Sequence, residues 1–392
     1  MKMYTHLPIL CNHLLQYVNK YNFEQISGQL KTDKRSKSFS TRKTFIGLFV
    51  GQVLNVSSIR EMCTIFWAHQ HKMYHLWLQD FSRSTFSDRI NKTPSLVFQE
   101  LFFHLLKEIK GALAKDQKHD ELNKIYAIDS TLVSLTLSVF DRAKYRKRKW
   151  GIKIHTRLDI SSALPDLFHI TDWKTHDWKP VEQLLPWLKE KDFLLFDRWY
   201  LDYDFLYTLQ KRKIFFVSRT KKSTNYCPIQ KLEISHPQIQ YDAICEFTLE
   251  DACKSYPEQF RIVRYTDSKE WKKYEYITND LESPAEKIAD LYKMRREIED
   301  LFRRLKQNLK IKQFFWTSRN AVENQVRVAM IYYLIVILIK TKTRCRESLL
   351  DLTRKFSTLL FERTHLLYVI WMSERKILLS NFQPPPSLFS SL

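Results

Sequence analysis

The order of apolar segments between Lys124 and Ser218 constrains the fold more than any other feature of this chain. Strand-like patterns occur in KIYAIDSTLVSL from Lys124, and then in Gly151–Leu158, Leu164–Ile170, Asp192–Asp197 and Phe215–Ser218. Helical patterns separate the last three of these segments, one at Val181–Leu188 and one after Asp197. The run DFLLFD is apolar between its two aspartates, which predicts a strand buried on both faces.

This order predicts an α/β fold with a ribonuclease-H-like mixed sheet and helices on both faces, in which the first strand lies beside the fourth. Asp129 follows an apolar run and is expected at the end of the first strand, and Asp197 ends the fourth. A single aspartate at a strand end is most often a cap or turn residue. Only the joint placement of the two favours a shared site, within reach of one metal cluster.

Residues 219–281 break the alternation of strands and helices. They hold strand-like pieces at Ile244–Leu249, Phe260–Tyr265 and Lys273–Thr278, polar turns and no convincing helix. We therefore expect a β-rich insertion, 219–281, between the fifth strand and the helix that follows. The catalytic domain is then made of residues 120–218 and 282–345.

The stretch Leu291–Lys310 predicts one amphipathic helix, because it is rich in Leu, Arg, Lys and Glu and lacks Gly and Pro. Tyr292, Arg295, Glu299 and Lys306 fall within an arc of roughly 60° on such a helix. A carboxylate flanked by a phenol and two cations suits a metal-dependent site that acts on a phosphodiester. The alternative is a surface helix with an ordinary Arg295–Glu299 pair at i,i+4.

One role would account for three carboxylates: Asp129, Asp197 and Glu299 could together hold divalent metal ions. Mg²⁺ takes oxygen ligands, and phosphodiester cleavage uses one metal to activate water and a second to stabilise the leaving oxygen. Arg295 and Lys306 would hold nearby phosphates.

Residues 1–115 predict an all-α N-terminal domain. Helical spacing is found at Asn22–Leu30, Thr44–Leu54 and Ser57–Trp67, with Ser57 as a start signal, and at Arg83–Asn91, with Ser84 or Ser87 as candidate caps. A compact helical domain with basic edges is a common DNA-docking module, and a helical scaffold with solvated charge is an equal alternative. At the other end, Val322–Lys340 predicts a buried helix that covers the sheet, and 346–392 a helical region with a flexible tail.

The formal net charge of +21 on a chain with 44% hydrophobic residues suggests a polyanionic partner, and nucleic acid suits it best. A membrane is disfavoured, because the longest apolar run, Val328–Ile339, is shorter than the ~20 residues that a span needs. The six Cys form no CxxC, which fits a reducing, cytoplasmic setting. The absence of a Gly-rich phosphate loop argues against an NTP. A basic run is either a solvated loop or a DNA-backbone contact; it holds Arg142, Lys144, Arg146, Lys147, Arg148 and Lys149.

The spacing Tyr292-x2-Arg295-x3-Glu299-x6-Lys306 resembles the YREK signature of DDE-class transposases of bacterial insertion sequences, the group called insertion-sequence family four. The resemblance runs from about Leu7 to Lys340. It includes IDST around Asp129, KTHD at Lys174–Asp177, DRWY at Asp197–Tyr200 and the β-rich insertion. The N-terminal helical region resembles the domain fused to this core in one subgroup.

The resemblance implies two Mg²⁺ or Mn²⁺ ions on the three carboxylates, and a homodimer acting on the terminal inverted repeats of double-stranded DNA. It implies hydrolytic nicking that frees a 3′-hydroxyl, which then attacks target DNA. Tyr292, Arg295 and Lys306 would hold a phosphate of the non-transferred strand. An aromatic residue of the insertion would stack on a flipped base, with Tyr274 first and Trp271 second in our ranking. The alternative for Tyr274 is an ordinary aromatic residue of the core or sheet.

One residue departs from the family pattern: relatives usually have a small residue where Trp199 stands. A bulky ring beside Asp197 leaves the activity of this copy open. The alternatives to a transposase are a nuclease on the same fold without strand transfer and a decayed relative that only binds DNA.

Overall fold

The structure, a computed structural model, describes residues 8–34, 39–78, 81–116, 124–135, 150–177, 179–234, 236–267, 271–308 and 318–371. The chain divides into two compact units. We call them the helical unit (Met1–Lys118, Ser138–Phe140 and Arg304–Leu392) and the sheet unit (His119–Leu137 and Asp141–Arg303). The expected DNA contact at Arg142–Lys149 and the expected flexible tail lie outside the described residues.

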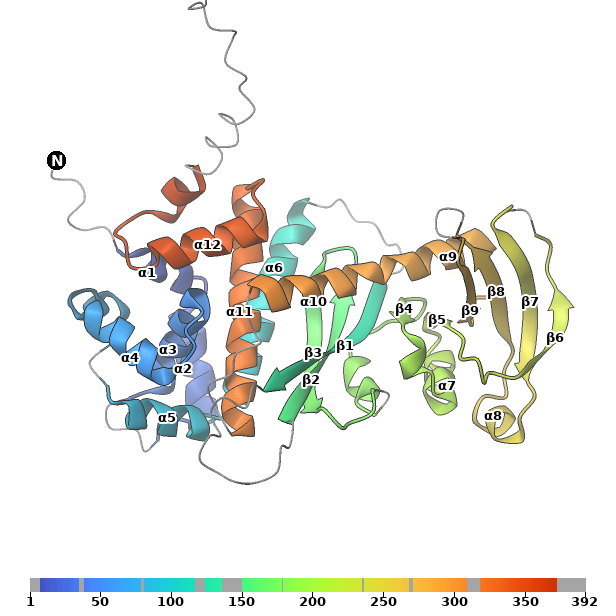
Figure 1. The fold of residues 1–392 in the computed structure, drawn as a ribbon, viewed down its shortest axis with the longest axis horizontal. Coiled ribbons are helices and arrows are strands. Elements are labelled where there is room, and N and C mark those ends of the chain that lie inside the picture. The colour runs from blue at the N-terminus through green and yellow to red at the C-terminus, as the bar shows by residue number, and fades with distance from the viewer. Residues whose placement is uncertain are drawn as a thin grey trace, which may run out of the picture. The chain divides into compact units, whose positions relative to one another are not determined.

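Among the described residues, nine strands form one mixed sheet in the sheet unit (Figure 1). They are β1 (Ile125–Leu135), β2 (Trp150–Asp159), β3 (Leu164–Asp172), β4 (Phe193–Phe196), β5 (Phe215–Arg219), β6 (Tyr226–Lys231), β7 (Ile239–Phe247), β8 (Phe260–Thr266) and β9 (Lys273–Thr278). Their order in the sheet is β3-β2-β1-β4-β5-β9-β8-β7-β6.

The first strand does lie beside the fourth, as the order of segments predicts. β1 pairs with β2 in the antiparallel sense and with β4 in the parallel sense, and β4 pairs with β5 in the parallel sense. β4 is buried along its whole length, in agreement with its apolar run. The mixed sheet, with helices on both sides, is confirmed.

The β-rich insertion continues the same sheet. Its last strand, β9, pairs with β5 in the antiparallel sense, and β8, β7 and β6 follow outward in turn. β6 is the outer edge and is mostly exposed, with a register irregularity against β7 beginning at Pro228. The insertion also contains one short helix, α8 (Glu250–Ser255), where the sequence pattern suggested none.

The remaining described helical elements of the sheet unit lie between strands or follow the last strand. Between strands lie η3 (Val181–Leu184), η4 (Arg198–Tyr200) and α7 (Tyr203–Lys211), and after the last strand come α9 (Ala285–Met294) and α10 (Arg296–Asn308), whose last residues belong to the helical unit. The expected helix Val181–Leu188 is wrong, because only the 3₁₀ turn η3 forms. Pro186 has no N–H to continue the helical hydrogen bonds, and Trp187 lies in the left-handed region at φ 68°, so the helix cannot extend to Leu188.

The helical unit combines both ends of the chain, drawn in blue and in orange to red in Figure 1. Its elements are α1 (Leu10–Leu15), α2 (Lys20–Gln29), α3 (Thr41–Leu54), α4 (Ile59–Ala68), η1 (Gln70–Leu76), α5 (Arg83–Lys92), α6 (Leu96–Asp116), α11 (Arg319–Thr343) and α12 (Leu349–Leu359). The helical N-terminal region is therefore present.

The caps of two helices differ from those expected. Ser58 caps α4 through the Glu61 N–H, while Ser57 bonds the Glu61 carboxylate. Ser82, rather than Ser84 or Ser87, caps α5.

α11 is the central helix of the helical unit and packs against α3, α5, α6 and α12. Among the described residues it is the one helix long and apolar enough to cross a membrane by length and composition. However, 78% of its most apolar window is buried inside the fold, as in a core helix. The expected burial of a helix at Val322–Lys340 is confirmed, but the elements it chiefly packs against are helices of its own unit, where we expected it to cover the sheet.

Candidate active site

Two aspartates follow the parallel pairing at the centre of the sheet. The ladder between β1 and β4 ends at the pair of Ile128 and Phe196, and Asp129 and Asp197 are the next residues of these strands. Because neighbouring strands lie about 4.8 Å apart, the two backbone positions are adjacent. Asp129 is not at a strand end, however. β1 continues to Leu135 in its antiparallel pairing with β2, so only the parallel pairing stops at Asp129.

Arg219 extends this row of residues onto a third strand. The parallel ladder of β4 and β5 ends at the pair of Phe196 and Ser218, so Arg219 follows beside Asp197. Its Nη2 donates to Asp197 Oδ1 at 3.0 Å, and the Arg198 N–H donates to the same oxygen at 2.7 Å. Our sequence reasoning missed Arg219. The register of β5 against β4 identifies it, since Arg219 is the next residue after the last parallel pair, Phe196 and Ser218.

The segment Leu291–Lys310 does not form one helix. α9 and α10 meet at Arg295, which belongs to neither. The Arg295 N–H donates to the Tyr292 carbonyl at 3.1 Å, and the Ile298 N–H donates to the Arg295 carbonyl at 3.2 Å. These three-residue spacings mark a tightened turn. The segment has no Gly or Pro, so its pattern carried no sign of the junction.

The junction places the Arg295 guanidinium between two carboxylates. Arg295 is 8% exposed; its Nη1 donates to Asp129 Oδ2 at 2.9 Å, and its Nη2 donates to Glu299. The Glu299 side chain is 49% exposed. The i,i+4 pair of the alternative interpretation therefore exists, but it is joined to the aspartate of β1.

The three carboxylates influence one another. Burial raises the pKa of Asp129 to about 6; Arg295 and the Ser130 N–H oppose this rise, and the charges of Asp197 and Glu299 add to it. Among the described residues, no group of three or more His, Cys, Asp or Glu side chains is arranged to hold a metal ion. A guanidinium bridges two of the carboxylates instead. The donor set still fits Mg²⁺, since it consists of carboxylate oxygens drawn together around a cation.

The other two residues of the YREK pattern are placed differently. Tyr292 is 8% exposed, and its ring lies 5.8 Å from the Arg219 guanidinium, 5.7 Å from that of Arg295 and 4.9 Å from the Tyr276 ring. It therefore packs between the two arginines. Lys306 is half-buried near the end of α10, in the part of that helix that belongs to the helical unit.

A pocket of about 230 Å³ opens beside the carboxylates in the sheet unit. It is lined by Arg219, Tyr265, Asp267, Tyr274, Tyr276, Tyr292, Lys293, Arg295, Arg296 and Glu299. Tyr274, the first choice for a stacking residue, is therefore beside the site. Trp271, the second choice, is 81% exposed and is not among the lining residues.

The three motif segments of the family meet behind Asp129. The Ser130 hydroxyl, from IDST, donates to Asp177 Oδ1 of KTHD at 2.8 Å, and Lys153 donates to the same oxygen at 3.3 Å. His155 Nδ1 lies 3.3 Å from the hydroxyl of Tyr200, from DRWY. Burial lowers the pKa of His155 to about 4, so its ring is neutral near pH 7. We call these five residues the support network.

Trp199, the departure from the family pattern, does not crowd Asp197. Its ring is 66% exposed and lies 5.8 Å from the Arg198 guanidinium. The described contacts of the Asp197 carboxylate come from the Arg198 N–H and from Arg219.

Two family models match parts of this chain. The family model described as Transposase DDE domain matches residues 121–335, and a second model, Domain of unknown function (DUF4372), matches residues 6–79. A distant solved structure, the cryo-EM structure of the piggyBac transposase synaptic complex with hairpin DNA, aligns with a TM-score of 0.44 at 12% identity. It covers 100% of this chain and 89% of that chain.

Curated relatives are named as transposases, and two of these names include an insertion sequence element. A protein of Synechocystis sp., named as a transposase for insertion sequence element IS4SA, is 28% identical over 84% of this chain and 90% of its own length. The transposase y4zB of Sinorhizobium fredii is 29% identical over 71% of this chain and 77% of its own length. A transposase for element IS5377 of Geobacillus stearothermophilus is 25% identical over 71% of this chain and 74% of its own length. The DDE model spans more than half of the chain and confirms the resemblance seen in the motifs: this protein belongs to the family of transposases with a DDE domain.

Proposed function

We propose that this protein is a metal-dependent DNA transposase that cleaves the terminal inverted repeats of its own insertion sequence and joins the freed 3′-hydroxyl to target DNA. One observation carries the proposal. Asp129, Asp197 and Glu299 come from β1, the end of β4 and α10, and their charges act on one another around Arg295. The chain belongs to a family of DNA-cutting and DNA-joining enzymes, which supports a role for these carboxylates in that chemistry.

Asp129, Asp197 and Glu299 would hold two Mg²⁺ ions, or Mn²⁺ in their place. Bound there, the ions would make a nucleophile from water or from the 3′-hydroxyl and stabilise the leaving oxygen. Arg295, now shared by Asp129 and Glu299, would be free to turn toward a phosphate of the DNA end. Lys306, later on α10, would hold a phosphate further along the strand.

The tyrosine-lined pocket would accept a base extruded from the DNA end. Tyr274 lines it and is half-buried, which supports Tyr274 over Trp271 as the stacking residue. Tyr292 packs its ring between Arg219 and Arg295, so its contribution to phosphate binding would come chiefly through the position of these two guanidinium groups. The active form would be a homodimer with one DNA end for each copy.

The test uses a supercoiled plasmid that carries both ends of the element, together with MgCl₂ and a second plasmid as target. Nicking at the ends and joined products are expected from the natural protein. Glu299→Gln should remove both activities, because it removes a carboxylate oxygen donor. Glu297→Gln is the matched control, since Glu297 lies on the same helix and is exposed.

The products distinguish the alternatives. Nicked ends that never join target DNA would identify a nuclease without strand transfer. DNA binding without nicking in the natural protein would identify a decayed relative.

A further inference from the structure

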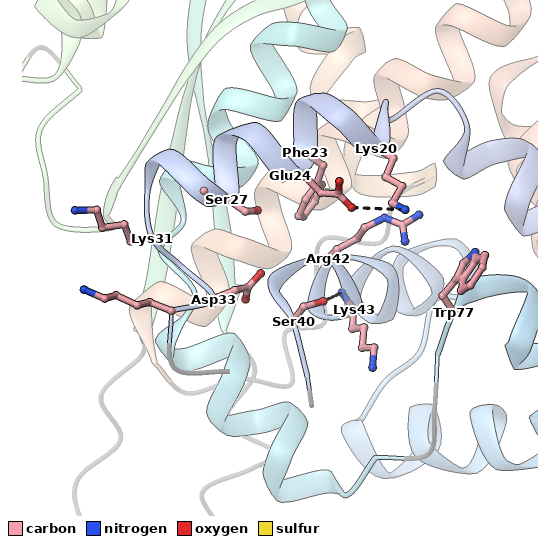
Figure 2. A pocket seen from close by; sticks show the side chains of 12 residues that line it. Lys20, Phe23, Glu24, Ser27, Lys31, Asp33, Ser40, Arg42, Lys43 and Trp77 are labelled. Atoms are coloured by element: carbon pink, nitrogen blue, oxygen red, sulfur yellow. Dashed lines mark hydrogen bonds and ion pairs between the residues drawn. The ribbon is translucent and has the colours of Figure 1, made fainter. Parts of the chain in front are cut away.

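A basic concave surface lies on the N-terminal helices, apart from the carboxylates. It borders a pocket of about 620 Å³ in the helical unit, whose cationic and aromatic rim residues are Lys20, Lys31, Lys34, Arg42, Lys43 and Trp77 (Figure 2). We call these six residues the basic groove. Lys31 stands at one end and Trp77 at the other in Figure 2. This groove falls within the segment matched by the domain of unknown function.

Cations outnumber acids around the groove. Five lysine or arginine side chains line the pocket against Glu24 and Asp33. Asp33 is already bound by Arg89 at 2.5 Å and by the Thr41 N–H at 2.8 Å, so its charge is largely satisfied elsewhere. Glu24 is exposed and lies 3.7 Å from Lys20, an arrangement that contributes little in water.

The helix that carries Arg42 and Lys43 places them where cations are least favourable. Both lie in the first turn of α3, and no acid lies in that turn. The N-terminus of a helix carries partial positive charge, so cations there raise the local potential instead of neutralising it. Burial lowers the pKa of Arg42, with Glu24 opposing the effect. A half-buried cation at such a position gains from a bound anion.

Trp77 is an unusual residue at the other end of the groove. It follows η1 in the left-handed region, at φ 56°, where a bulky side chain is disfavoured and Gly or Asn is common. Its ring is 76% exposed. Neither the backbone geometry nor burial accounts for a tryptophan here, whereas an aromatic face beside cations suits a nucleotide.

The concave surface is longer than a small anion requires. A second pocket of about 580 Å³ adjoins the first and shares Lys20, Arg42 and Trp77 with it, and adds one cation, Lys342, and one acid, Glu108. Cations spaced over two adjoining pockets match the repeating charge of a phosphate backbone.

From these observations we propose that the basic groove binds the phosphate backbone of double-stranded DNA, with Trp77 packed against a sugar or base at the edge of the contact. The proposal rests on the proposed function, since it supplies the DNA contact of the N-terminal domain. The contact is independent of the metal, and it can therefore be measured with the carboxylate site inactive.

The test measures binding of the full chain to a fluorescein-labelled random-sequence DNA duplex in EDTA, over a range of KCl concentrations. Each lost phosphate contact lowers the slope of log Kd against log salt by about 0.9. R42Q/K43Q should therefore bind about tenfold more weakly and lose about two units of slope. Trp77→Ala should also bind about tenfold more weakly, with its slope unchanged.

Two further variants keep the result interpretable. K107Q/R354Q removes the same charge from exposed positions elsewhere on the helical unit and should bind like the natural protein. K31Q/K34Q alters two exposed lysines of the groove and should lower the slope even if R42Q/K43Q fails to fold.

The outcomes separate this inference from the proposed function. If the groove variants match K107Q/R354Q while the protein still nicks its plasmid, the groove is not the DNA contact and the proposed function stands. If the natural protein binds no duplex in EDTA, the groove inference fails, and the plasmid nicking assay alone decides the proposed function. Tighter binding to an RNA duplex of the same sequence would overturn the assignment to DNA.

Discussion

Two kinds of arginine–carboxylate contact occur in the sheet unit, and their difference separates structural from functional charge. Arg157 and Asp166 are 0% and 3% exposed and form a two-pronged pair, with Arg157 Nε and Nη2 2.8 and 2.9 Å from the two carboxylate oxygens. Arg157 Nη1 donates to the carbonyls of Leu184 and Pro186. Every nitrogen of this guanidinium is thus engaged.

The arginines of the carboxylate site are less completely bound. Arg219 and Arg295 each contact an aspartate through one nitrogen, and the buried Nε of each has no hydrogen-bond partner among the described residues. Each faces carboxylates that also repel one another. A buried pair whose hydrogen bonds are all made stabilises the fold. Where the arginine has an unused donor, the carboxylate can bind a metal ion and the arginine a phosphate, with a smaller loss of free energy.

Removal of Arg157 should have the largest effect on stability. Arg157→Gln leaves the Asp166 carboxylate buried and unpaired, so we expect a loss of about 3–5 kcal/mol in the free energy of unfolding. Urea denaturation measures it. Arg264→Gln is the control: Arg264 pairs with Glu275 at 2.7 Å but its side chain is 50% exposed, and it should cost no more than about 1 kcal/mol. Equal losses would erase the distinction between the two kinds of contact.

Magnesium should stabilise the protein through the second kind of contact. At a concentration 100 times its Kd, a ligand of the native state adds about 2.7 kcal/mol. We expect MgCl₂ to raise the thermal midpoint of the natural protein, and to raise it much less in Asp197→Asn. Glu297→Gln should keep the full shift. A shift of equal size in Asp197→Asn would mean that Mg²⁺ binds elsewhere.

The support network should affect the reaction and not the fold. In Asp177→Asn the oxygen that accepts from the Ser130 hydroxyl remains, but its negative charge is lost. The hydrogen bond that holds Ser130, the neighbour of Asp129, is therefore weaker. Losses at such supporting positions are typically about 10- to 100-fold, and we expect that decrease in the nicking rate, together with a higher Mg²⁺ requirement. Glu182→Gln, on the exposed side of η3, is the control. An unchanged Mg²⁺ requirement would show that Asp177 does not act through Asp129.

Trp199 should matter least. Its ring is mostly exposed and makes no described contact with Asp197, so Trp199→Gly should change stability by no more than about 0.5 kcal/mol. The nicking rate should stay within about twofold of the natural protein. A much faster variant would show that the ring restrains the turn after β4.

The sequence predicted what depends on order along the chain. The succession of strands placed Asp129 beside Asp197, because a ribonuclease-H-like order leaves few ways to pair them. Arg219 depended on the register of β5 against β4, which a strand pattern does not contain. The turn at Arg295 arises in a segment with good helical propensity throughout, so tertiary contacts with Asp129 must select it.

The support network escaped prediction for a different reason. Ser130, Lys153 and Asp177 lie on three segments that are 23 to 47 residues apart. Each alone has an ordinary explanation as a strand or turn residue. Only the folded sheet shows that Ser130 and Lys153 both donate to one carboxylate oxygen of Asp177.

The pairing of β9 with β5 determines which parts of the insertion can change during evolution. β9 leads directly into α9, which carries Tyr292, and its hydrogen bonds cover a strand edge next to Arg219. Deleting the insertion as a block would uncover that edge and displace α9. β6 is the opposite case: it is exposed, and Pro228 and the register irregularity after it discourage a further strand from pairing there. Length variation among relatives should therefore collect around β6 and β7, while the segment from β9 to α10 keeps a nearly fixed length.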